Sequence, residues 1–239
     1  MNDVVSKHGS KSSLILPEGT KVWLNAGSKI YYHKDFTANR EVYLSGEAFF
    51  DVTHNAGKPF TIHAGPVNIK VLGTAFNVKA YPEDDLVETA LLRGSIELTT
   101  VADPGRKILL RPNEKISINK TKRDIGKNNA LPTGKPSPKE ELYSISRMLV
   151  YKKDSTLEDI AKMEDKVIFK GETFSELSIK MERWYDVEMI FKNEQVKKIK
   201  FTGAFDKQNI VQALQALQFS CNYQFVFSIS KNQILISPR

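Results

Sequence analysis

Apolar and polar residues alternate along the first half of the chain. Between Leu14 and Ile118, short stretches in which every second residue is apolar are separated by turn sequences at intervals of about 8 to 12 residues. A period of two is typical of strands that bury one face. Because no stretch here has the helical period, the pattern excludes parallel βαβ units. It predicts an all-β domain, either a sandwich or a flattened solenoid-like fold.

The clearest alternation lies in Val67–Tyr81, where its phase shifts by one residue. Apolar residues occupy the odd positions from 67 to 71 and the even positions from 76 to 80. Gly73 lies at the shift, and we expect a corner there between two β-layers, since glycine tolerates the backbone of a bulge or tight turn. A phosphate loop would need Lys-Ser or Lys-Thr and a helix, whereas Ala75–Asn77 opens a second strand.

The helical period appears in the last third of the chain. Apolar residues three and four positions apart predict an amphipathic helix that starts at Phe174 and a second helix over 210–217. Thr173 and Glu176 have the spacing of a capping box. Strands are expected at 167–169, 187–191, 199–205, 223–229 and 233–237. The helix-strand unit repeats with an offset of 36 residues, from Phe174 to Ile210, which predicts a small α+β domain with two helices on one sheet.

These patterns divide the chain into four parts. The predicted parts are a disordered or membrane-proximal stub (1–13), an all-β domain (14–118), a basic linker rich in proline and glycine (119–140), and an α+β domain (141–239, with its core in 165–239). Within 141–164 the pattern allows a strand or a short helix and favours neither.

The net charge of +7 is confined to one segment. Arg106–Lys139 contains ten basic and two acidic residues, so the rest of the chain is nearly neutral. Few aromatic residues lie among these charges, which argues against a platform that stacks nucleic-acid bases. We expect solvated charge, with a patch for anionic headgroups or sugars as the alternative, and no nucleic-acid partner. No apolar run approaches about 18 residues, and the polar residues 1–13 have the pattern of neither a signal peptide nor an anchor. We therefore expect either a cytoplasmic protein or a fragment whose targeting segment is missing.

The residue types that carry chemistry are sparse and scattered. The candidates are His33, His54, His63, Glu47, Asp51 and Cys221. The histidines lack ligand spacing, the two carboxylates lack an aromatic cleft around them, and the single cysteine has no histidine in its half of the chain. The sequence therefore predicts no catalytic residue, no metal site and no cofactor.

Five ordered motifs carry a family resemblance. They are Leu16–Ser28, Arg40–Val52, Lys58–Phe60, Val71–Val78 and Leu91–Ile96. This series resembles the FecR family, the periplasmic regions of transmembrane anti-sigma factors, in the form found in Bacteroides-type bacteria. The resemblance implies a cytoplasmic anti-sigma segment and one inner-membrane helix before residue 1. Because this chain contains neither, we expect it to be the periplasmic part alone.

The last part of the chain resembles a domain that accompanies FecR regions. Glu182–Val187 and Phe201–Phe205 match that C-terminal domain, which is similar to the short N-terminal domain of secretins and TonB-dependent transporters. Met163 stands where the family has tryptophan. The resemblance implies a partner, the N-terminal signalling domain of a TonB-dependent outer-membrane transporter, and control of an extracytoplasmic-function sigma factor through the cytoplasmic segment.

We expect the partner to bind at a strand edge of the second domain, where backbone groups can pair with another chain. The strand Ile199–Phe205 is the first candidate because glycine interrupts its alternation. The predicted partner-binding residues are Ile199, Phe201, Gly203 and Phe205.

A glycan-binding β-domain is the alternative function. Trp23, Tyr31, Tyr32 and Tyr43 would form a surface on which sugars stack. Tyr32 is two positions from Ile30 and therefore lies on the same, inward face of its strand. This weighs against Tyr32 as part of the sugar-stacking surface.

Overall fold

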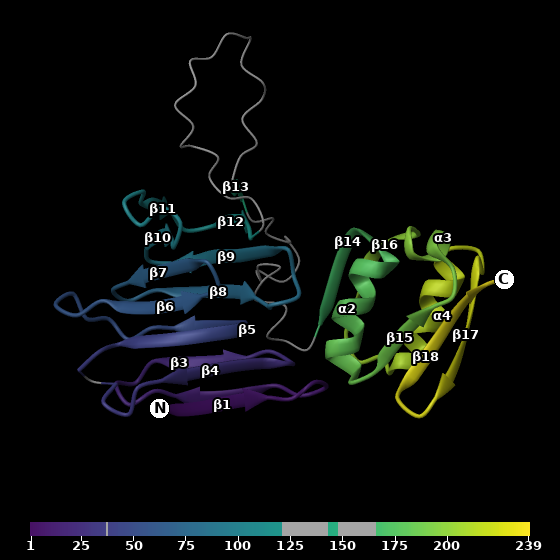
Figure 1. Cartoon of the computed structure of the whole chain (residues 1–239), viewed down its shortest axis with the longest axis horizontal. Coiled ribbons are helices and arrows are strands. Elements are labelled where there is room, and N and C mark those ends of the chain that lie inside the picture. Colours follow the sequence, from purple (N-terminus) through teal and green to yellow (C-terminus); the bar gives the residue numbers. More distant parts are fainter. Residues whose placement is uncertain (37, 121–142, 148–165) are drawn as a thin grey trace, which may run out of the picture. The chain divides into compact units, whose positions relative to one another are not determined.

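The computed structural model describes residues 1–36, 38–120, 143–147 and 166–239. They form two compact units (Figure 1). The first comprises Met1–Val5 and Ser12–Leu149, and the second comprises Ser6–Lys11 and Val150–Arg239. In the described part of the chain, no helix has the length and apolarity needed to cross a membrane.

The first unit is built from strands alone among its described residues. Its strands are β1 (Asn2–Ser6), β2 (Ser12–Ile15), β3 (Lys21–Leu24), β4 (Ser28–Tyr32), β5 (Glu41–Asp51), β6 (Phe60–Ala64), β7 (Val67–Val71), β8 (Ala75–Ala80), β9 (Leu86–Arg93), β10 (Ile96–Thr100), β11 (Ile108–Leu110), β12 (Glu114–Asn119) and β13 (Tyr143–Arg147). They form one curled sheet in the order β11-β10-β7-β6-β5-β8-β9-β12-β13. In addition, β3 and β4 pair with β5, β2 pairs with β3, and β1 pairs with β4. This confirms the all-β prediction.

The long strand β5 belongs to both arms of the sheet. Its first half pairs with β4 and, in parallel, with β6, whereas its second half pairs with β3 and β8. Gly46 lies between the halves with a φ of +113°, and a Cβ there would lie 2.6 Å from Ser28 Cα. Only glycine fits this junction.

The phase shift around Gly73 is the corner that the sequence predicts. β7 pairs with β6 and β10 in one arm, and β8 pairs with β5 and β9 in the other. A Cβ on Gly73 would lie 2.7 Å from His54 Cα. Glycine is therefore required by the close approach of two backbone segments, and the register of β8 shifts directly afterwards, between Ala75 and Phe76.

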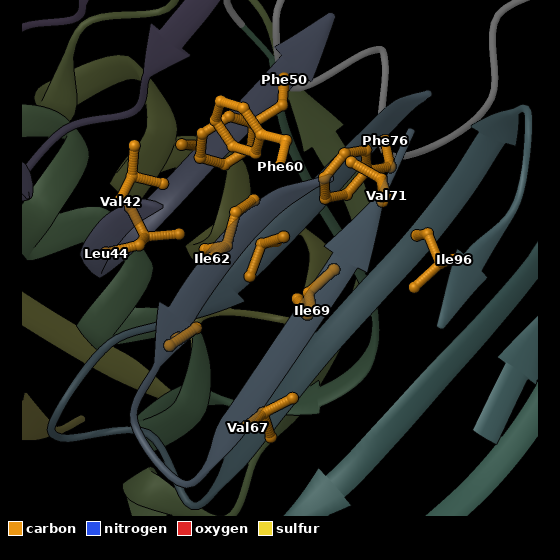
Figure 2. Close-up of a cluster of buried hydrophobic side chains, with 14 of the residues drawn as sticks. Val42, Leu44, Phe50, Phe60, Ile62, Val67, Ile69, Val71, Phe76 and Ile96 are labelled. Carbon is orange, nitrogen blue, oxygen red and sulfur yellow. The ribbon is translucent and has the colours of Figure 1, made fainter. Parts of the chain in front are cut away.

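The core of the first unit consists of the alternate residues that face inward on these strands (Figure 2). Phe50 stacks on Phe76 at a centroid distance of 5.5 Å and meets Phe60 edge-on at 6.1 Å. All three side chains are fully buried. Each such burial contributes about 1.5–3 kcal/mol relative to exposure, so this aromatic cluster is a main source of the unit's stability.

Two expectations about the ends of the first unit need correction. Residues 2–6 form β1, which pairs with β4, so the prediction of disorder over 1–13 is wrong for this part; Val4 packs against the core. Tyr143–Arg147, expected in the second domain, forms β13 and pairs with β12. The predicted linker (119–140) begins one residue too early, because Asn119 is the last residue of β12. Its residues 121–140 lie outside the described residues, as do 141–142 and 148–164 of the undecided stretch, Met163 among them.

The second unit mixes helices and strands. Its elements are β14 (Val167–Thr173), α2 (Phe174–Tyr185), β15 (Glu188–Phe191), α3 (Glu194–Lys197), β16 (Lys200–Phe205), α4 (Ile210–Ser220), β17 (Phe225–Ser230) and β18 (Gln233–Pro238). The α+β prediction is confirmed, with one refinement: the strands form two sheets, β14-β16 and β15-β18-β17, rather than one. The short helix α3, which starts at its N-cap Asn193, was not predicted.

The predicted repeat is visible as β14-α2-β15 followed by β16-α4-β17. At the start of α2, Thr173 and Glu176 form the predicted capping box. Phe174 then packs against Phe201 and Phe225, with ring centroids 5.1 and 4.9 Å away. The first helical residue thereby ties the two sheets into one core.

Candidate interaction surfaces

The family-like motifs meet at three buried junctions of the first unit. At the first, the Arg40 guanidinium donates to the carbonyls of Lys58 and Thr53, both at 2.7 Å, and pairs with Glu18 at 3.2 Å. Glu18 in turn accepts a bond from the backbone N–H of Thr20. Because Arg40 is 4% exposed, it acts as an internal clamp on two loops and is not an exposed binding group.

The second junction surrounds the buried carboxylate of Glu47. The side-chain amides of Asn25 and Asn77 donate to its two oxygens at 3.0 and 2.9 Å. The backbone N–H of Glu47 donates to Ser28 Oγ, and Tyr81 donates to the carbonyl of Ala26. These bonds hold the β3–β4 turn against β5 and β8.

The third junction is the corner at Gly73. Thr74 donates to the carbonyl of Ser95 at 3.0 Å, and the backbone N–H of Val52 donates to the carbonyl of Thr74. Gly94 has a φ of +93°, and a Cβ there would lie 3.0 Å from the carbonyl oxygen of Gly73. The sequence motifs that carry the family resemblance therefore stabilise the fold through contacts within the first unit.

The candidate chemical groups do not converge. Glu47 holds the amides described above, and Asp51 pairs with Arg93 at 2.8 Å. His33 and His54 are exposed on separate loops, and Cys221 is buried. Within the described ranges no three His, Cys, Asp or Glu side chains group closely enough to hold a metal ion.

His63 has partners that the sequence did not indicate. It stacks on Tyr43 at 4.6 Å, its Nδ1 lies 2.7 Å from Asn68 Oδ1, and its Nε2 lies 3.7 Å from Glu41. These contacts cross three strands, so they follow from the register of β5, β6 and β7, which a single sequence does not reveal.

The four aromatic residues proposed for sugar stacking do not share one open stacking surface. Tyr31 and Tyr43 stack face to face at 5.3 Å with an interplanar angle of 11°, so each ring covers a face of the other. Trp23 contacts Phe49, and Tyr32 packs edge-on against Phe36. Because a sugar needs an open ring face, this arrangement does not favour the glycan-binding alternative.

The described part of the basic segment is engaged in local contacts. Lys107 pairs with Glu97 at 3.0 Å. Lys120 donates to the carbonyls of Tyr81 and Pro82, and burial lowers its pKa below the ordinary value. Lys107 is 62% exposed, as the prediction of solvated charge requires, whereas Lys120 is held by backbone carbonyls of the fold.

In β16, the strand proposed for partner binding, the large apolar side chains are buried, so a partner would contact mainly its backbone. Phe201 and Phe205 are 4% and 5% exposed, and Ile199 packs on the same core. A Cβ on Gly203 would lie 3.1 Å from Phe169 Cζ, so this glycine makes room for an aromatic ring. Thr202, Gly203 and Ala204 are exposed, and β14 is the one described strand that pairs with β16.

A second strand edge is more apolar. β17 forms one side of the sheet β15-β18-β17, and its Val226 and Ile229 are 43% and 41% exposed. The preceding helix exposes Phe219 at 72%, which meets Tyr223 edge-on. No charged residue occurs in 208–230, in a chain in which 26% of residues are charged.

Comparison with known proteins gives matches for both units. A family model described as FecR protein matches residues 2–97, and one described as FecR, C-terminal matches residues 166–236. Two crystal structures of a candidate anti-sigma factor from Parabacteroides distasonis are 28% identical to the chain and cover all of it, with TM-scores of 0.79 and 0.78; the matches span 100% and 99% of those chains. No curated protein matches in sequence.

Proposed function

This chain belongs to the FecR family of anti-sigma factors, and we propose that it is the periplasmic signalling part of such a factor, anchored in the inner membrane by a preceding helix. In this proposal, a TonB-dependent outer-membrane transporter that has bound its nutrient presents its small N-terminal signalling domain to the chain. The contact changes how the cytoplasmic segment holds or releases an extracytoplasmic-function sigma factor. The chain itself makes and breaks no bonds.

The observation that carries the proposal is that residues of the family motifs make structural contacts inside the first unit. Arg40, Glu47 and Gly73 each hold a junction inside the first unit, and the chemical candidates have structural partners or lie apart. What both units offer to another molecule is therefore surface. A protein whose described parts consist of two separately cored units is suited to recognition and to the transmission of a contact.

We place the transporter's signalling domain at the edge of β16 with which no described strand pairs. The predicted residues are Phe201, Gly203 and Phe205 of this strand and Ile199, which directly precedes it. The two phenylalanine side chains are buried in the core, so they anchor the strand and are not available to a partner. Recognition then depends on the backbone groups of 202–204, to which an extended strand of the partner can add.

Calorimetric titration of the whole chain with the isolated signalling domain tests this location. Ala204→Lys places a long charged side chain at the proposed edge and is expected to weaken binding by about tenfold or more. Leu109→Lys is the matched control, because Leu109 is 67% exposed on β11 of the first unit, and it should leave the affinity unchanged. Equal affinities for all three proteins would reject the edge of β16 as the site.

A further inference from the structure

We propose that the edge of β17 with which no described strand pairs binds the same edge of a second copy of this chain, so that the sheet β15-β18-β17 becomes a continuous six-stranded sheet across a two-fold axis. This surface differs from the edge of β16 and does not depend on the proposed partner.

The backbone of β17 has its pairing groups directed outward at alternate residues. The N–H of Arg239 donates to the carbonyl of Gln224, which continues the antiparallel register Phe225↔Pro238. Because hydrogen-bonded and non-hydrogen-bonded positions alternate in such a ladder, residues 225, 227 and 229 direct their N–H and C=O groups away from β18. Gln218 Nε2 donates to the outward carbonyl of Phe225 at 2.9 Å, which agrees with this assignment. Pairing at residue 225 requires this side-chain amide to give up that bond, whereas the described side chains make no bond of this kind to residues 227 and 229.

Apart from the Gln218 bond at one end, the described residues of this edge lack the features that usually prevent strand addition. Exposed edge strands are commonly protected by lysine, proline or a bulge. β17 contains neither lysine nor proline, and its pairing with β18 runs without a register shift over six residues. The opposite edge, β15, begins instead with the acidic Glu188. Figure 1 shows β17 in yellow as an outer strand of its sheet.

The sequence of β17 is complementary to itself. An antiparallel pair centred on Phe227 places Phe227 opposite its symmetry mate and Phe225 opposite Ile229 of the second copy. On the other face, Val226 lies opposite Ser228. Residues 225, 227 and 229 are also those with outward backbone groups, so side-chain and backbone pairing agree in one register. Centring the pair on Ser228 would instead place Phe225 opposite Lys231.

The absence of charge favours a second copy over a different protein. At a two-fold interface each residue near the axis meets its own kind, and a charged side chain there would meet a like charge, which is destabilising. A surface selected for a different partner can use opposite charges for recognition. Residues 208–230 carry no charge at all, and exposed Phe219 and Tyr223 flank the Phe225 end of the edge, where they extend the apolar contact.

Sedimentation of the whole chain over a concentration series tests the proposal. The wild type should change reversibly from monomer to dimer. Ile229→Lys, which places a charge opposite Phe225 of the second copy, should raise the dimer dissociation constant by about tenfold or more. Ile15→Lys is the control, since Ile15 is 68% exposed on β2, and it should dimerise like the wild type. A monomeric wild type, or a dimer that Ile229→Lys does not weaken, overturns the proposal.

Cross-linking tests the register independently of stability. In the proposed pair, Val226 lies opposite Ser228 at a position where two cysteines can form a disulfide. The double variant Val226→Cys with Ser228→Cys should form a covalent dimer on mild oxidation. The control pair, Val226→Cys with Ser230→Cys, fits the pairing centred on Ser228. Cross-linking of the control alone, or of neither variant, contradicts the proposed interface.

Discussion

Arg40 and Glu18, 22 positions apart in the chain, form an ion pair whose side chains are 3% and 15% exposed. The guanidinium also donates to two loop carbonyls and lies over the ring of Phe60. One charged side chain thus joins the turn before β3, the loop after β5 and the start of β6. The parts of the chain that carry the first three motifs meet at this side chain.

Replacing Arg40 should therefore lower the free energy of unfolding strongly. Arg40→Ala leaves the shielded Glu18 carboxylate and two loop carbonyls without their partner, and loss of one member of a buried pair costs about 3–5 kcal/mol. Arg93→Ala is the control, because Arg93 is 67% exposed in its pair with Asp51 and such pairs contribute at most about 1 kcal/mol. Urea unfolding followed by circular dichroism measures both. Similar losses in the two variants would contradict the clamp.

Gly73 should not tolerate even the smallest side chain. The Cβ of Gly73→Ala would lie 2.5 Å from His54 Nδ1 and 2.7 Å from its Cα, so two loops must separate, at a cost of about 1–3 kcal/mol. Gly57→Ala meets nothing closer than 3.7 Å and serves as the control. Thermal unfolding should show a lower midpoint for the first variant alone; unchanged midpoints in both would argue against the corner.

The capping box of α2 should give a pH-dependent contribution to stability. The Thr173 backbone and side chain donate to the Glu176 carboxylate and hold its pKa below the ordinary 4.5. Since the folded pKa is depressed, the contribution is present above the unfolded pKa and is lost as pH falls through the folded one.

Glu176→Gln should therefore reduce the free energy of unfolding at neutral pH, and its difference from the wild type should shrink in acid. Thr173→Ala should cost about 1 kcal/mol at neutral pH. Denaturant titrations at several pH values measure these effects. A difference between wild type and Glu176→Gln that grows as pH falls would contradict the sign.

The Tyr185 hydroxyl should lose its proton at a higher pH than an exposed tyrosine does. Burial raises its pKa to about 12, and its hydroxyl donates to the carbonyl of Gln208 at 3.0 Å. Phenolate absorbance is titrated in the wild type and in Tyr185→Phe, and the difference between the two curves is the titration of Tyr185. We expect that signal near pH 12, provided that the fold persists there, as circular dichroism can verify. A difference signal near pH 10 would show that Tyr185 is exposed.

The sequence predicted what depends on neighbours along the chain. The alternation identified the inward residues, the phase shift identified the corner at Gly73, and the spacing of Thr173 and Glu176 identified the start of α2. Each of these signals is local, because strand parity and helix caps are set within a few residues.

What the sequence did not reveal depends on contacts between distant segments. Nothing near Arg40 indicates that it is buried, since its partners lie 13 to 22 positions away. The contacts of His63 require the register of three strands. The division of the second unit into two sheets follows from the pairing of β18 with both β15 and β17, and strand parity does not encode which strands pair.

Amide hydrogen exchange of the whole chain, with and without the transporter's signalling domain, tests the central claim most directly, since it locates partner contact residue by residue. The account predicts slower exchange on binding in 200–205 of the second unit and unchanged exchange at the buried junctions around Arg40 and Glu47. Protection confined to the strands of the first unit, or no change anywhere at saturating partner, would contradict it.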